Sequence, residues 1–119
     1  MIEKIVKEMT LKEKVGQLNQ HLYGWQCYQK VNGKYELTDL FKEHVKEYGG
    51  VGAIYGILRA DAWSQINREN GISREDSKIV ITMIQEYIKK HSRFEIPALI
   101  SEECVHGHMA VSYTHLRAH

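Results

Sequence analysis

The chain has 119 residues, of which 43% are hydrophobic and 26% are charged, with one proline and nine glycines. This length suits one domain, and this composition is typical of a globular rather than a disordered protein. Sixteen basic residues against 15 acidic ones give a formal net charge of +1. The charge therefore gives no reason to expect nucleic acid or an anionic membrane as a partner.

The N-terminus and the cysteines bear on the compartment. Residues 1–8 include acidic side chains and lack the apolar run of a signal peptide, and no apolar run in the chain is long enough to span a bilayer. Cys27 and Cys104 form no CxxC motif, so a reducing compartment is the default. If Met1 is the true start, the sequence predicts a soluble cytoplasmic protein.

The first predicted elements are a short helix and a hairpin. Thr10 and Glu13 have the spacing of a capping box, and apolar residues at helical spacing extend this helix over 11–20. Asn32 and Gly33 follow a β-prone stretch and precede another. This pair predicts a β-hairpin, because both central positions of such a turn need positive φ.

A second helix and a strand come next. Thr38 can cap a helix over 39–48, and Gly49 can end it. The run 50–58 is apolar throughout and rich in small residues, which predicts a strand buried on both faces. The glycines at 49–52 lead into this strand rather than into a helix, so they form no phosphate-binding loop. No cofactor is expected. A polar loop continues to Ile72.

A third helix and a second strand complete a βαβ unit. Ser73–Asp76 offers a cap for a helix that runs to about His91 with a broad apolar stripe. Pro97 then opens a short apolar run, which is typical of a buried parallel strand. The order strand, loop, helix, strand predicts a parallel pair and an α/β fold. One such unit cannot cover both faces of its own sheet, so we expect a larger architecture.

Polar side chains follow the second strand directly. Glu102 and Glu103 are neighbours, so on a strand they would point to opposite faces. They are therefore not expected to form the acid and base pair of a glycosidase. Spacing alone leaves open whether Glu102 lines a site or forms a salt bridge in a loop.

A thiol and two imidazoles come after these carboxylates. The spacing of Cys104, His106 and His108 matches none of the usual zinc patterns, so a buried thiol and hydrogen-bonding imidazoles are favoured over a metal site. A Cys and His nucleophile pair is a weaker alternative, because such partners are normally distant in sequence. His106, which precedes Gly107, is expected to anchor the loop through backbone groups.

The loop after the first strand holds Arg59, Asp61 and Trp63. Ligand contacts gather at the carboxyl ends of parallel strands, so these side chains are candidates for substrate binding. Trp63 could stack on a sugar or a base, and the alternative is local packing.

Three segments resemble glycoside hydrolase family 3, in the order and at the spacing of that family. They are its N-terminal signature in Met9–Leu18, its first barrel strand in 50–54, and its second strand and following loop in 96–103 with His106 and Gly107. The resemblance covers 1–110. It implies a retaining, exo-acting β-glycosidase on a (β/α)₈ barrel, most often a β-glucosidase, whose substrate is a β-linked oligosaccharide or glycoside.

The resemblance also assigns roles to residues. Glu103 matches the carboxylate on the second strand that binds sugar hydroxyls, a position that is aspartate in many members. The nucleophile of the family is an aspartate in a Ser-Asp-Trp-like motif on a late strand; Asp61–Trp63 follows the first strand instead. Lys90 and His91 match the sugar-holding Lys-His pair in letters alone, because they end an amphipathic helix. No catalytic residue is therefore expected in this chain, and we expect it to be inactive by itself.

The domain organisation follows from the same comparison. Residues 1–110 are expected to form the first two βα units of a barrel that needs about 250 residues, preceded by helices and a hairpin. Residues 111–119 resemble a tail that recurs on truncated open reading frames, and no function is assigned to them. The alternative is a non-catalytic α/β domain that binds sugar or a protein through Glu103, Arg59 and Trp63.

Overall fold

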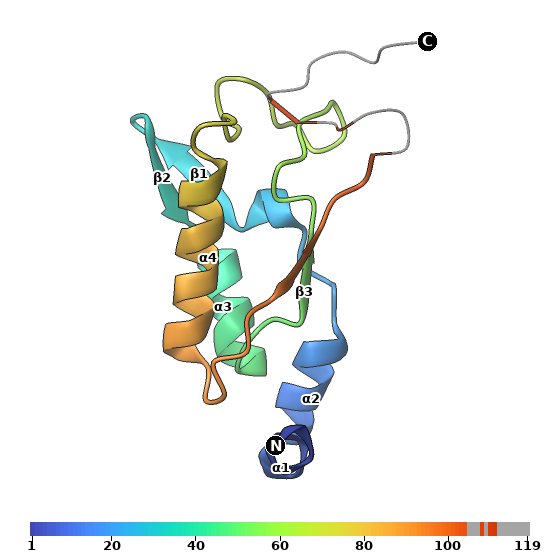
Figure 1. The fold of residues 1–119 in the computed structure, drawn as a ribbon. Coiled ribbons are helices and arrows are strands. Elements are labelled where there is room, and N and C mark those ends of the chain that lie inside the picture. Colours follow the sequence, from blue (N-terminus) through green and yellow to red (C-terminus); the bar gives the residue numbers. More distant parts are fainter. Residues whose placement is uncertain (105–107, 109, 112–119) are drawn as a thin grey trace.

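The computed structural model describes residues 1–104, 108, 110 and 111. Figure 1 shows how the helices and strands follow one another. In chain order they are α1 (Ile2–Glu8), α2 (Leu11–Leu18), the 3₁₀ turn η1 (Gly24–Gln26), β1 (Tyr28–Val31), β2 (Lys34–Leu37), α3 (Asp39–Tyr48), β3 (Ala53–Tyr55), α4 (Ser77–His91) and β4 (Leu99–Ser101).

The N-terminal helices confirm one prediction and add an element. Helix α2 begins where expected, with the Thr10 hydroxyl accepting a hydrogen bond from the Glu13 amide at 3.2 Å, and it ends two residues early. The Glu13 carboxylate does not complete the capping box by bonding to the Thr10 amide. It pairs with Arg93 instead, at 3.0 Å. Helix α1 was not predicted: it buries none of its residues, so its sequence carries no core-facing stripe.

The hairpin forms as predicted. Strands β1 and β2 pair antiparallel, with Tyr28 opposite Leu37. The turn residues Asn32 and Gly33 have φ of 52° and 78°, the positive values that a two-residue hairpin turn requires. The hairpin is tied to the start of α4, because the Tyr35 hydroxyl donates to the Asp76 carboxylate at 2.8 Å.

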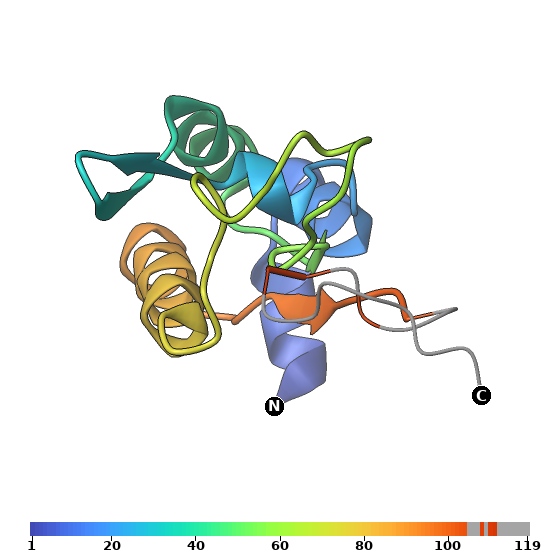
Figure 2. The ribbon, with the colours of Figure 1, turned by 90° about the horizontal axis from the view of Figure 1, so that it is seen from above.

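Helix α3 spans the predicted residues. Thr38 caps it by accepting from the Phe41 amide at 3.3 Å, and the same hydroxyl donates to the Gln26 carbonyl at 2.6 Å. Gly49 ends the helix in the left-handed region, with φ of 65°. In Figures 1 and 2, α3 and α4 lie next to the hairpin, and α1 lies at the lower end of the molecule in Figure 1.

The βαβ unit is present. Strands β3 and β4 pair in parallel, with Ile54 opposite Ile100, and α4 lies between them in the chain. The first strand is shorter than the predicted 50–58, since Gly56 has φ of 81° and leaves the strand conformation. Asp76 precedes α4 but does not cap it through its side chain, which is engaged by the hairpin.

The core lies between α3, α4, the hairpin and β3. Its fully buried side chains come from each of these elements or the segments beside them: Cys27, Phe41, Val45, Val51, Ile54, Ile57, Val80, Ile84 and Ile88. The predicted burial of the second strand holds for the face of Ile100, which packs against the core, and is wrong for the opposite face. Leu99 in β4 is 76% exposed, because no described element covers that face.

The fold is therefore a small α/β protein with four α-helices and two two-stranded sheets in its described part, and this part contains no closed barrel. Among the described residues, no helix combines the length and the apolar character that crossing a bilayer requires.

Candidate functional site

The loops after β3 and β4 meet at the carboxyl ends of the two strands. The Gly56 amide donates to the Ser101 carbonyl at 2.9 Å, which continues the parallel pairing past β3. The loop after β3 carries Arg59, and the loop after β4 carries Glu103; the guanidinium and the carboxylate lie 3.6 Å apart. The structure thus brings together candidates that are distant in the sequence.

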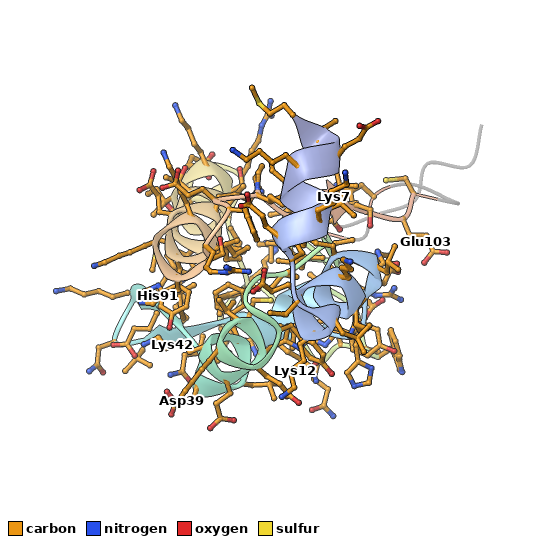
Figure 3. All side chains as sticks on the ribbon, turned by 90° about the horizontal axis from the view of Figure 1, so that it is seen from below. Lys7, Lys12, Asp39, Lys42, His91 and Glu103 are labelled. Atoms are coloured by element: carbon orange, nitrogen blue, oxygen red, sulfur yellow. The ribbon has the colours of Figure 1, made fainter. Side chains whose placement is uncertain are left out.

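Glu103 presents an open carboxylate. Its side chain is 56% exposed, and Figure 3 shows it at the edge of the molecule, pointing outward. One oxygen accepts a hydrogen bond from the Tyr55 hydroxyl at 2.7 Å, and that hydroxyl also accepts from Arg59. The bond to Glu103 raises the pKa of Tyr55. The carboxylate is held on one side and remains open to a ligand on the other.

Glu102 has a different role. Its carboxylate accepts from the Leu58 amide at 2.9 Å and lies 3.5 Å from Nε2 of His108. β4 ends at Ser101, so both glutamates lie beyond the strand, each with its own partners. Glu102 joins the two loops, which favours the structural interpretation of this residue that the spacing left open.

Asp61 holds the arginine. Its carboxylate lies 2.7 Å from Arg59 Nε, and the two side chains are 10% and 19% exposed. Burial raises the pKa of Asp61, but hydrogen bonds from Ser64 and the Arg59 guanidinium outweigh burial and hold it below its ordinary value. The carboxylate of Asp61 is thus paired with protein groups in this structure, and its predicted contact with substrate stays a prediction.

An aromatic cluster surrounds the arginine, and we define it as Tyr23, Trp25, Tyr55 and Trp63. Trp25 stacks on Tyr23 with ring centroids 4.5 Å apart, and Trp63 meets Trp25 edge-on at 5.2 Å. The Arg59 guanidinium lies 4.8 Å from the Trp63 ring centroid. Trp63 is 61% exposed and Tyr23 38%. The cluster thus offers ring surface to a ligand beside Glu103.

Sequence reasoning missed Tyr23, Trp25 and Tyr55. No local sequence pattern marks them. Gly24 lies between two of these aromatic residues, and a Cβ there would come within 2.2 Å of the Ile57 amide nitrogen. Such close approach of two backbones requires glycine.

The predicted loop residues His106 and Gly107 fall outside the described residues. The expectation of a buried thiol is wrong, because Cys104 follows the end of β4 and is an exposed free thiol. No group of three or more histidine, cysteine, aspartate or glutamate side chains in the described part is arranged to hold a metal ion.

Comparison with known proteins supplies no relative. No protein-family model matches this chain, and a search of curated proteins finds no significant match. The resemblance to glycoside hydrolase family 3 therefore stays a prediction.

Proposed function

We propose that this chain is the N-terminal part of the barrel domain of a retaining, exo-acting β-glycosidase of glycoside hydrolase family 3, with β-glucosidase as its activity. The observation that carries the proposal is the open carboxylate of Glu103 at the carboxyl end of β4, next to Arg59 and the aromatic cluster. The substrate is a β-linked oligosaccharide or glycoside whose terminal sugar contacts Glu103.

The side chains of Glu103, Arg59 and Trp63 offer the kinds of contact that bind a sugar. A carboxylate can accept hydrogen bonds from two neighbouring hydroxyl groups, and an aromatic ring can pack against the apolar face of a pyranose. Glu103 supplies the first feature and Trp63 the second. Each hydrogen bond to the charged carboxylate contributes about 1.5–3 kcal/mol, which raises the rate when the bond tightens in the transition state.

The packing of β4 agrees with a larger sheet. In the described residues β4 pairs with β3 alone, and its Leu99 side chain is 76% exposed. In a barrel, a third parallel strand would pair with the outer edge of β4, and a following helix would cover Leu99.

The bond-breaking groups are proposed to lie outside residues 1–110. A retaining enzyme needs a nucleophile and an acid whose carboxyl groups are about 5–5.5 Å apart. Glu102 is engaged with the Leu58 amide and Glu103 with Tyr55. In this proposal neither performs catalysis, and Glu103 binds substrate.

The test compares three polypeptides on an aryl β-glucoside. The chain alone should give no turnover. The chain joined at Ala110 to its natural downstream coding sequence should give turnover. Glu103→Ala in that longer protein should lower kcat/KM by at least about ten- to a hundredfold, the effect of losing one of its two charged hydrogen bonds to the sugar.

Glu36→Ala is the matched control, because Glu36 is an exposed glutamate on the hairpin. It should leave kcat/KM unchanged. Turnover by the chain alone, or equal effects of the two substitutions, would contradict the proposal.

The second candidate is a non-catalytic domain that binds sugar. Glu103, Arg59 and Trp63 lie together within the described residues, and this observation favours the non-catalytic candidate. It predicts saturable glucose binding by the chain alone, measured by tryptophan fluorescence, and loss of that binding in Glu103→Ala.

A further inference from the structure

A cavity lies between α3 and α4, away from Glu103. It has a volume of about 320 Å³ and is lined by Lys42, Glu43 and Lys46 from α3 and by Tyr87 and His91 from α4. Figure 3 shows Lys42 and His91 next to each other between the two helices, on the side opposite Glu103. The cavity shares no residue with the candidate sugar site.

The cavity carries unneutralised positive charge. Lys42 and Lys46 are four residues apart on α3, so their side chains lie on one face of the helix. Among the described residues, neither ammonium forms an ion pair, although Glu43 lines the same wall.

The imidazole of His91 is fixed in position. It stacks on the Tyr87 ring with centroids 3.9 Å apart and an interplanar angle of 20°. Tyr87 in turn packs against the buried Phe41 at 5.5 Å. His91 Nδ1 lies 3.0 Å from the Tyr87 carbonyl, and because a carbonyl only accepts, Nδ1 carries the hydrogen. Nε2 has no hydrogen bond to a described residue and is left for a ligand.

We propose that this cavity binds a dianionic phosphate monoester. The two ammonium groups would donate to the phosphate oxygens, Nε2 of His91 would accept a hydrogen bond from a hydroxyl group of the organic part, and the Tyr87 ring would pack against that part. Glu43 limits the excess of positive charge, which suits a dianion better than a polyphosphate, and its carboxylate can accept a hydroxyl hydrogen bond from the organic part. The volume is at the lower end of ligand pockets, roughly 300–1,000 Å³.

The test is an NMR titration of the 119-residue chain with glucose 6-phosphate at constant ionic strength. The imidazole resonances of His91 and the ring resonances of Tyr87 should shift and saturate. Glucose and sodium chloride over the same range should leave them in place. Lys42→Gln should weaken binding about tenfold, since it removes one of the phosphate-binding cations.

Lys12→Gln is the matched control, because Lys12 is an exposed lysine on α2 and its loss changes the net charge equally. It should leave the affinity unchanged. Equal weakening by both variants would mean a general charge attraction and would overturn the proposal, as would the absence of a saturable shift at His91. Glu103→Ala should not affect phosphate binding, so this proposal and the proposed sugar site fail independently.

Discussion

His44 is a histidine held away from water on the inner face of α3. It is 8% exposed, its Nε2 has no hydrogen-bond partner, and its ring packs against Tyr48 at a centroid distance of 4.9 Å. Burial lowers the pKa of His44, and the nearby His21 lowers it further, while Glu47 acts in the opposite direction. The charged form is therefore disfavoured in the folded chain.

This environment predicts a pH dependence of stability. The folded pKa lies below that of the unfolded chain, so the unfolded state takes up the proton first as pH falls. The stability due to neutral His44 should be complete above about pH 6.5 and should be lost progressively below it. Urea unfolding between pH 5 and pH 8 measures the slope.

His44→Phe keeps a ring against Tyr48 and cannot be protonated, so it should unfold with a weaker pH dependence below about pH 6.5. His44→Gln is a second variant that also removes the titratable ring, so it should reduce the pH dependence by the same amount even if it unfolds more easily at every pH. Equal slopes for the wild type and His44→Phe would show that the charge on His44 does not affect unfolding.

At the residue scale, sequence reasoning found part of the candidate site. Arg59 and Glu103 could be predicted because polar residues that follow parallel strands gather at one edge of the sheet. Trp25 could not, because it reaches the site through a bridge between Tyr23 and Tyr55, and no local pattern encodes such a contact. The pairing of Asp61 with Arg59 and Ser64 could not be predicted either, because it depends on how the loop folds in space.

Gly52 joins α2 to β3. Its amide donates to the Gly16 carbonyl at 3.0 Å, and a Cβ on Gly52 would lie 1.9 Å from the Gln17 carbonyl oxygen. Gly52→Ala should therefore push α2 away from β3 and lower the free energy of unfolding by at least about 1–3 kcal/mol, the usual effect of overpacking. Urea unfolding gives the loss, and hydrogen exchange at residue 52 reports the broken contact.

Gly33→Ala separates steric overlap from backbone strain. No atom lies within 4 Å of a Cβ at Gly33, but its φ is +78°, so this variant should lose roughly 1–2 kcal/mol from strain alone. In Gly33→Ala the amide of Gly52 should exchange no faster than the lower global stability of this variant requires, because its bond to Gly16 is intact. If Gly52→Ala leaves that protection intact, the contact does not hold α2 in place.

At the scale of elements, local signals predicted what local interactions determine. The hairpin turn at Asn32 and Gly33 and the cap at Thr38 depend on neighbours within a few residues, and both were predicted correctly. The burial of β4 depends on which distant segments pack against it. The apolar residues around Leu99 therefore predicted a buried face that is exposed in the structure. Helix α1 was missed because it has no buried face to leave a periodic pattern.

At the scale of the whole molecule, the most exposed large hydrophobic strand residue of the described part lies on β4. Leu99 is 76% exposed on a strand with one partner in the described part, and such an apolar edge promotes self-association. Leu99→Lys should lower the self-association of the chain, measured by sedimentation velocity. Its free energy of unfolding should change by no more than about 0.5 kcal/mol, because the side chain is already in water.

Leu40→Lys is the matched control, since Leu40 is 50% exposed on α3. An equal reduction in self-association by Leu40→Lys would rule out the edge of β4 as the cause. In the longer protein proposed above, Leu99→Lys should instead be strongly destabilising, because the barrel would bury that side chain.

The parallel pairing of β3 with β4 has a consequence for synthesis on the ribosome. β3 leaves the ribosome first, and its partner follows only after the crossover of residues 56–98 has been made. The hairpin and α3 depend on short-range contacts and can form early, whereas closing a long loop is slow. Until β4 arrives, Ile54 lacks part of its final cover. The nascent chain therefore passes through a stage with an unpaired apolar strand, when a chaperone has most to contribute.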